Sequence, residues 1–446
     1  MRSFLKHFAL LTLRVFFRRV LVIGEDKVPK EGPLLFVLNH NNALVDPTFV
    51  LCCAPRRVSF LAKAPLFKMP VIGTMLRVME SLPVYRRQDE GSNPAQNKET
   101  FEAAKRILRG GGTIALFPEG ISHSESKLKP LKTGAARIAL GASPLKIVPA
   151  GLYYTAKGAF RSSAVLVFSD PFEVPKYDLG PTEDPAPEAV HALTSKIDQS
   201  LKDLIIQADQ SESLTLVSRA ERIFRSAEAN HPSEKNNPVG EFELKRLLLA
   251  GYTTLRARFP EKLEEIKSLI DQYEASLQEA GIDPFHLRPH RFDPIGFLIG
   301  LFKALGYILL AGLFFPFVLC GLILHFPAYR LVGVLSVRYA KEDQDMISTV
   351  KMLAAMLLFP LTWLIAAIAL GRTMGLNWFF SSFLIFPFSG ICALLFLEKL
   401  NEILGRTKTF GLFFSNPKSF QMLLEERERI RKTILSLEQL LNQTQG

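Results

Sequence analysis

Two short polar motifs, each following an apolar run, contain residue types that can carry acid–base chemistry. His40 and Asp46 stand six positions apart, just after Leu34–Leu38, which we expect to be a buried strand. The turns that follow strands in α/β folds display reactive side chains. A carboxylate that hydrogen-bonds to a histidine fixes its tautomer and raises its basicity. The pair is therefore suited to taking a proton from a hydroxyl near neutral pH.

The second motif, Phe117-Pro118-Glu119-Gly120, ends another apolar run that begins at Thr113. It offers a carboxylate together with a glycine, whose missing Cβ lets backbone amides approach an anion. The two motifs together predict proton abstraction from an alcohol beside an anion-binding loop.

Residues 25–175 alternate between patterns typical of strands and of helices. This alternation indicates an α/β class, with a mostly parallel sheet and flanking helices. One helix is expected at Asn97–Arg109, because three consecutive glycines follow it. The expected strands are Leu34–Leu38, Val58–Ala62, Leu82–Tyr85, Thr113–Phe117, Lys146–Ala150 and Ala164–Phe168.

At these motifs the chain resembles the glycerolipid acyltransferase family. The segments NHNNALVDP (39–47), LPVYRR (82–87), FPEGISHS (117–124) and IVPAG (147–151) fall in the order of the family's sequence blocks. LKPLKTGAARIAL (128–140) also resembles the fungal-type glycerol-3-phosphate/dihydroxyacetone-phosphate acyltransferases and their bacterial relatives. The resemblance implies an acyltransferase fold over residues 20–175. It also implies transfer of a fatty acyl group from acyl-CoA or acyl carrier protein to a hydroxyl of a glycerol-phosphate-type acceptor, with no cofactor.

The same resemblance implies roles for individual residues. His40 is expected to be the general base and Asp46 the carboxylate that orients it. Arg86 resembles the phosphate-binding arginine of the family and is preferred to its neighbour Arg87. A guanidinium fork suits a phosphate dianion better than an ammonium group does.

The remaining candidate residues follow the second motif. Glu119 and Gly120 resemble the acceptor-binding block, and Glu119 is expected to bind a hydroxyl or to anchor the arginine, since a glutamate beside a phosphate is repulsive. Ser122 and His123 are candidate hydrogen-bond donors to the acceptor. Lys132 is a second candidate phosphate ligand, and the alternative for it is a solvated surface lysine.

Two departures from the family pattern raise an alternative. Five residues separate His40 from Asp46, whereas the family's usual spacing is His-x4-Asp, and the arginine usual after FPEG-Thr is missing. Separately, Asp46 followed by Pro47 predicts a helix N-cap, opening a helix through Cys53, and this role can coexist with orienting His40. The alternative is a membrane-binding protein of the same fold that has lost its activity.

Membrane lipid is the partner that the charge pattern favours over nucleic acid. The formal net charge is +11, and residues 1–24 interleave basic with apolar and aromatic residues and contain no acid. We expect an amphipathic helix lying on the membrane, with packing on the protein's own core as the alternative. The run Phe8–Leu13 is too short for the apolar region of a signal peptide.

Three late apolar stretches predict a membrane region with the acyltransferase domain on its cytoplasmic face, in a bacterial inner membrane or the endoplasmic reticulum. Met352–Leu370 and Leu376–Leu397 are long enough to span. Ile295–Phe326 contains Lys303 and Pro316, and the surrounding basic residues favour a turn back at Pro316 over a single crossing. The scarcity of ionisable residues disfavours substrate transport through these stretches.

The sequence thus divides into five parts: an interfacial helix (1–24), the acyltransferase domain (25–175), a helical segment (176–290), a membrane region (291–398) and a helical tail (399–446). The tail's heptad-like pattern, interrupted by Arg427, predicts either a homodimer through this helix or packing on the same chain. The cysteines have no metal-binding spacing, and we expect small buried hydrophobes in a reducing compartment.

Overall fold

A computed structural model describes residues 2–86, 94–179, 184–208, 211–228, 237–287, 294–340 and 343–443. The chain forms two compact units. The first contains Met1–Ser211 together with Pro238–Phe242 and Ala340–Thr349, and the second contains the remaining residues.

The first unit is built on one sheet, with strand order β1-β7-β6-β2-β5-β3-β4 and β8 paired with β6. β6 pairs antiparallel with β7 and β8, whereas the other pairs are parallel. The strands are β1 Arg19–Ile23, β2 Leu34–Leu38, β3 Ser59–Lys63, β4 Leu82–Val84, β5 Thr113–Leu116, β6 Leu145–Tyr154, β7 Ser163–Phe168 and β8 Phe172–Val174. The sheet is mostly parallel, as predicted.

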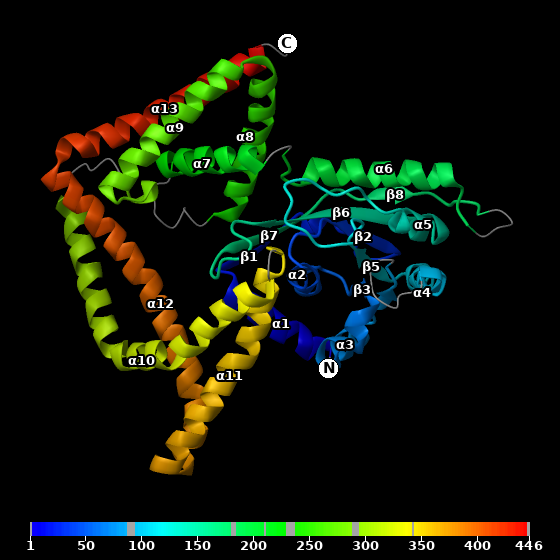
Figure 1. Cartoon of the computed structure of the whole chain (residues 1–446), viewed down its shortest axis with the longest axis horizontal. Helices are drawn as coiled ribbons and strands as arrows, with labels where there is room; N and C mark the ends of the chain where they lie inside the picture. Colours follow the sequence, from blue (N-terminus) through cyan, green and yellow to red (C-terminus); the bar gives the residue numbers. More distant parts are fainter. Residues whose placement is uncertain are drawn as a thin grey trace. The chain divides into compact units, whose positions relative to one another are not determined.

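Helices cover both faces of this sheet (Figure 1). Successive side chains of a strand point to opposite faces, so the fully buried β2 contributes to two cores. Leu35 and Val37 pack with α4, α5 and α6, while Phe36 contacts Phe168, with ring centroids 5.3 Å apart, on the other face. The helices are α1 Arg2–Phe16, α2 Val45–Cys53, α3 Pro70–Val78, α4 Asn97–Arg109, α5 Gly134–Gly141 and α6 Pro187–Leu204.

Every predicted strand is present, with ends that shift by a few residues, and the predicted helix at Asn97–Arg109 is α4. The prediction of a helix through residue 24 is wrong, because α1 ends at Phe16. The chain then forms β1, which pairs in parallel with β7. β1 and β8 were not predicted, and β6 is longer than its apolar run indicated.

The N-terminal helix α1 has apolar side chains on two faces. Ala9, Leu13 and Phe16 are buried against the first unit. A second set is exposed at helical spacing, and consists of Phe4, Phe8, Leu11 and Val15. Since residues three, four and seven positions apart share one helix face, α1 packs on the protein and presents an apolar stripe outward.

The second unit has its own core, formed by α7 Ser211–Glu228, α8 Pro238–Arg258, α9 Pro260–Ala280 and α13 Pro417–Gln443. Apolar side chains of α13 pack against α9, so the heptad-like pattern of the tail is used within the chain. Arg427, which interrupts that pattern, is buried. It donates hydrogen bonds to the carbonyl oxygens of Ser226, Pro284 and Leu287. These bonds compensate for burying its charge.

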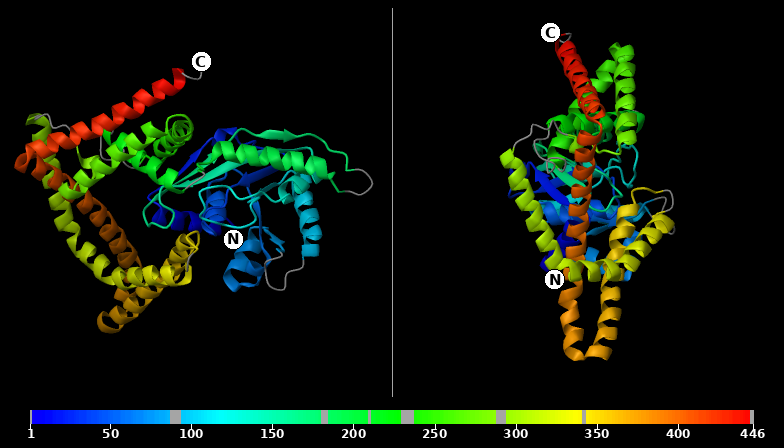
Figure 2. Two further views of the ribbon diagram at one scale, coloured as in Figure 1. Left: turned by 45° about the horizontal axis from the view of Figure 1, so that its top comes forward. Right: turned by 90° about the vertical axis from the view of Figure 1, so that its left-hand side faces the viewer.

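Among the described residues, three helical stretches are long and apolar enough to cross a membrane. They are Gly312–Ala340 within α10 (Pro294–Ala340), α11 Ile347–Met374 and α12 Leu376–Ser415. The break predicted at Pro316 is absent, because α10 continues as one helix of 47 residues that includes Pro316 and Pro327. The ribbon of α10 nevertheless bends sharply (Figures 1 and 2). Proline removes a helical hydrogen bond and is a common cause of such bends.

Candidate active site

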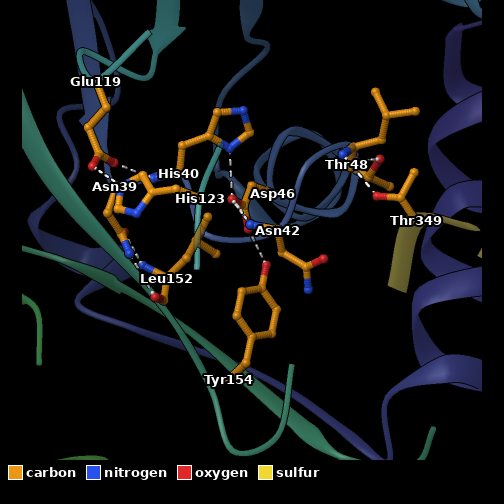
Figure 3. Close-up of polar contacts among 11 residues, drawn as sticks. Asn39, His40, Asn42, Asp46, Thr48, Glu119, His123, Leu152, Tyr154 and Thr349 are labelled. Atoms are coloured by element: carbon orange, nitrogen blue, oxygen red, sulfur yellow. Dashed lines mark hydrogen bonds and ion pairs between the residues drawn. The ribbon is translucent and has the colours of Figure 1, made fainter. Parts of the chain in front are cut away.

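His40 follows β2, and Asp46 lies in the first turn of α2. The Nδ1 atom of His40 donates a hydrogen bond to Oδ2 of Asp46 at 2.9 Å (Figure 3). The His40 ring stacks on Phe117, the residue after β5, with centroids 4.1 Å apart. The His40 side chain is 17% exposed, whereas that of Asp46 is fully buried. Because an ionised carboxylate can only accept, the proton is on Nδ1 and Nε2 is the basic nitrogen.

The Asp46 carboxylate is held by two further donors. The backbone N–H of Asn42 donates to Oδ2 at 2.7 Å, and the hydroxyl of Tyr154, at the end of β6, donates to Oδ1 at 2.5 Å. Burial, followed by the negative charge of Asp46, raises the pKa of the Tyr154 hydroxyl well above its ordinary value. Tyr154 therefore stays protonated and remains a donor.

A tight turn takes up the extra residue between His40 and Asp46. Ala43 has a φ of 24°, outside the usual range for residues with a side chain. The helix begins at Val45 with Leu44 as its N-cap. The prediction that Asp46 is the N-cap is therefore wrong: its carboxylate accepts from the upstream Asn42 and not from the helix.

Glu119 is buried and holds the backbone of His40. Its Oε1 atom accepts from the His40 N–H at 2.8 Å, and its Oε2 atom accepts from the Lys129 N–H at 2.8 Å and from Nε2 of His123. The His123 N–H in turn donates to the His40 carbonyl at 3.1 Å. Glu119 and His123 thus bond the backbone N–H and the carbonyl of His40, a role that the sequence did not suggest for Glu119.

The predicted donors Ser122 and His123 lie in the loop after β5, where Ser122 is half-buried. His123 is buried, and its Nδ1 atom accepts from the Glu125 N–H at 3.2 Å. Its proton is therefore on Nε2, directed to Glu119. His123 acts here on the protein and not on a ligand.

Arg86 and Lys132 meet at Gly120. Arg86 donates from Nη1 to the Gly120 carbonyl at 3.1 Å. The stem of Lys132 lies against Gly120, where an added Cβ would be 2.9 Å from its Cδ. Gly120 also has a φ of 74°, which favours glycine. Two cations thus converge one residue from Glu119, and Arg87 lies outside the described residues.

Sequence reasoning missed two polar residues of the site. Asn39 is buried, and its amide bonds with both the N–H and the carbonyl of Leu152, at 2.8 and 3.1 Å. It extends the pairing of β2 with β6 by one residue, next to His40. Asn39 could have been identified as a site residue from its place in the NHNNALVDP segment. Tyr154 could not, because no motif in the sequence surrounds it. Among the described residues no cluster of metal-binding side chains occurs.

Comparison with known proteins identifies the family. A model described as acyltransferase matches residues 19–153. A second, described as the glycerol-3-phosphate acyltransferase 2 C-terminal domain, matches residues 217–443, which is about half of the chain. The chain belongs to this family. Its two matched regions follow one another, and the first contains His40, Asp46, Arg86 and Glu119.

Curated relatives carry related names. Glycerol-3-phosphate O-acyltransferase 1 of Saccharomyces cerevisiae is 25% identical over 78% of this chain and 58% of its own length. Glycerol-3-phosphate O-acyltransferase 2 of the same yeast is 28% identical over 61% of this chain and 38% of its own length. The chain therefore spans less than two thirds of the length of either yeast relative. The 1-acyl-sn-glycerol-3-phosphate acyltransferase of Bacillus subtilis is 27% identical over 43% of this chain and 90% of its own length.

Tyr154→Phe should destabilise the first unit. It removes a donor from a buried carboxylate, and hydrogen bonds to charged groups contribute about 1.5–3 kcal/mol. The matched control is Tyr153→Phe, whose hydroxyl donates to the half-buried Glu241 at 2.8 Å. Thermal unfolding of both variants in detergent measures the difference. Equal melting temperatures for the two would contradict a special role of the Tyr154 bond.

Proposed function

We propose that this chain is a membrane-bound O-acyltransferase that moves a fatty acyl group from a thioester donor to a hydroxyl of a glycerol-phosphate-type acceptor. The donor is acyl-CoA or acyl carrier protein. The observation that carries the proposal is the connection of the His40–Asp46 pair to the two cations. Glu119 accepts from the His40 N–H, and Arg86 and Lys132 contact the next residue, Gly120. A base for a hydroxyl and a site for a phosphate are the two elements that this reaction needs.

In the proposed reaction, Nε2 of His40 takes the proton of the acceptor hydroxyl while that oxygen attacks the thioester carbonyl. The new carbon–oxygen bond forms, the carbon–sulfur bond breaks, and the proton on His40 passes to the departing thiolate. Asp46 keeps Nδ1 protonated and stabilises the imidazolium charge as it develops. The reaction needs no covalent enzyme intermediate.

Arg86 and Lys132 are proposed to bind the acceptor phosphate. Lys132 is exposed and Arg86 half-buried, so both can reach a ligand, and two charge-assisted contacts fit a dianion. Glu119 is proposed as a positioning residue, because its carboxylate already accepts from three protein donors. The alternative of a degenerate protein rested partly on the altered His–Asp spacing, and the 2.9 Å bond between these residues argues against it.

His40→Ala should lower kcat by about 10²–10⁴-fold, because a general base contributes on that scale. Asp46→Asn should also lose much of the activity, since the amide can bond His40 but carries no charge. The matched controls are His191→Ala on the exposed face of α6 and Asp170→Asn at the surface. Wild-type turnover in His40→Ala would remove this residue from the mechanism.

Arg86→Lys should raise the KM for the phosphate-bearing acceptor by roughly 10- to 100-fold, because bonds to charged groups are worth about 1.5–3 kcal/mol and lysine lacks the fork. The KM for the acyl donor should not change. Glycerol 3-phosphate, dihydroxyacetone phosphate and 1-acylglycerol 3-phosphate are assayed in turn, with the exposed Arg106→Lys on α4 as control. A change confined to the donor KM would place the phosphate elsewhere, and Lys132 would be tested next.

The proposed membrane orientation follows from chain connectivity. Phe242 packs on β7 in the first unit, and no candidate span occurs in the described residues between it and α10. The residues after α10, up to Thr349, again belong to the first unit. We therefore infer that α10 enters and leaves the membrane on the side of His40, the cytoplasmic face, and that only α11 and α12 cross. The outward stripe of α1 is proposed to rest in the same membrane surface.

Single cysteines in a cysteine-free background test this orientation. Cysteines at the exposed Gln344 and Phe410 should resist an impermeant thiol reagent in intact cells, whereas one at Met374, between α11 and α12, should react. Labelling at 344 combined with protection at 374 would contradict the proposed orientation and indicate the opposite one.

A further inference from the structure

The segment Asp343–Thr349, which lies after α10 and includes the first three residues of α11, contains polar residues that are buried in the first unit. Asp345, Ser348 and Thr349 are all almost fully buried. Helices that only anchor a domain would leave such residues in water at the membrane surface. We call this segment the junction.

Two hydrogen bonds and an apolar contact join the junction to the residues around the active site. The backbone N–H of Leu44 donates to the Thr349 hydroxyl at 3.1 Å. The Ser348 hydroxyl donates to the carbonyl oxygen of Lys157, just after β6. Ile347 lies beside Gly158, where an added Cβ would be 3.1 Å from the Ile347 Cγ2.

The bond to Leu44 reaches the turn that sets the His40–Asp46 geometry. Leu44 is the N-cap of α2, and its side chain has no polar atom with which to cap the helix. Ala43, the residue before it, is in an unfavourable backbone conformation with a φ of 24°. A strained turn persists when its surroundings hold it. Thr349 holds this turn from outside.

Lys157 adds an electrostatic connection between the junction and the dyad. Its side chain is half-buried. Burial lowers the pKa of its ammonium group, whereas the nearby carboxylates of Asp46, Asp345 and Glu119 act in the opposite direction. One carboxylate of the junction and two of the active site therefore act on the same lysine.

We propose that the junction is a positioning element of the active site, in which Thr349 fixes the Asn42–Asp46 turn and thereby the Asp46 carboxylate behind His40. The C-terminal region thus supports the catalytic rate in addition to attaching the enzyme to the membrane. The kinetic part of this proposal rests on the proposed acyl transfer, whereas the docking of the junction does not.

Thr349→Val, which replaces a hydroxyl by a methyl group, tests the kinetic part. We expect kcat to fall about tenfold, the scale of one lost hydrogen bond, with both KM values unchanged. The melting temperature should also fall, because the Leu44 N–H loses its partner. Thr349→Ser should restore kcat. The control is Thr362→Val on α11, whose hydroxyl donates to the Leu358 carbonyl of its own helix. Wild-type kcat in Thr349→Val, or a loss that serine does not rescue, would overturn the proposal.

A disulfide tests the docking without any assay of activity. A Cβ built on Gly158 lies 3.6 Å from the Cβ of Ile347, within the range of about 3.5–4.5 Å found in disulfides. Gly158→Cys with Ile347→Cys should cross-link on mild oxidation of the full-length, otherwise cysteine-free protein. Gly158→Cys with Leu357→Cys, at an exposed position further along α11, should not. The cross-linked protein should keep the turnover of its reduced form. Failure to cross-link, or a loss of turnover that reductant reverses, would overturn the proposal.

Discussion

The buried carboxylate of Asp46 is the constraint on which the site depends. A charged group without exposure to water is tolerated only when hydrogen bonds replace its hydration. Asp46 finds them in His40, in the Asn42 N–H and in Tyr154. These donors come from the end of β2, from the turn before α2 and from the end of β6. The neighbouring strands β2 and β6 must therefore end at the same edge of the sheet for the dyad to exist.

The start of α2 shows how the chain adapts to one extra residue in the His–Asp spacing. The first N–H groups of a helix need partners from outside it. The N–H groups of Val45 and Asp46 both donate to the Asn42 carbonyl, and Pro47 has no N–H. The Leu44 N–H still needs an acceptor, and the Thr349 hydroxyl provides it. The longer turn therefore leaves one donor pointing outward, and the chain satisfies it with a residue from the membrane region.

Apolar runs predicted most of the sheet, because a strand buried on both faces reads as a short continuous apolar segment. β1 escaped prediction because its residues follow a basic, aromatic pattern that also suits an amphipathic helix. In the site, His40 and Asp46 were recognisable since they are close in sequence. Tyr154 and Thr349 were not, because they stand 108 and 305 residues from their partners. Glu119 was expected to bind a hydroxyl or to anchor Arg86, whereas its carboxylate accepts a hydrogen bond from the backbone N–H of His40.

Two histidine–carboxylate pairs lie side by side here, and burial separates their roles. In the first pair, Asp46 accepts from Nδ1 of His40. The His40 side chain is 17% exposed, so its Nε2 is available to a substrate. In the second, His123 is only 6% exposed and Glu119 not at all, and the histidine's other nitrogen accepts from the Glu125 N–H. Neither nitrogen of His123 is left to exchange a proton with a ligand. A histidine and a carboxylate thus form the proposed base in the first pair, and in the second pair they hold the backbone of that base in place.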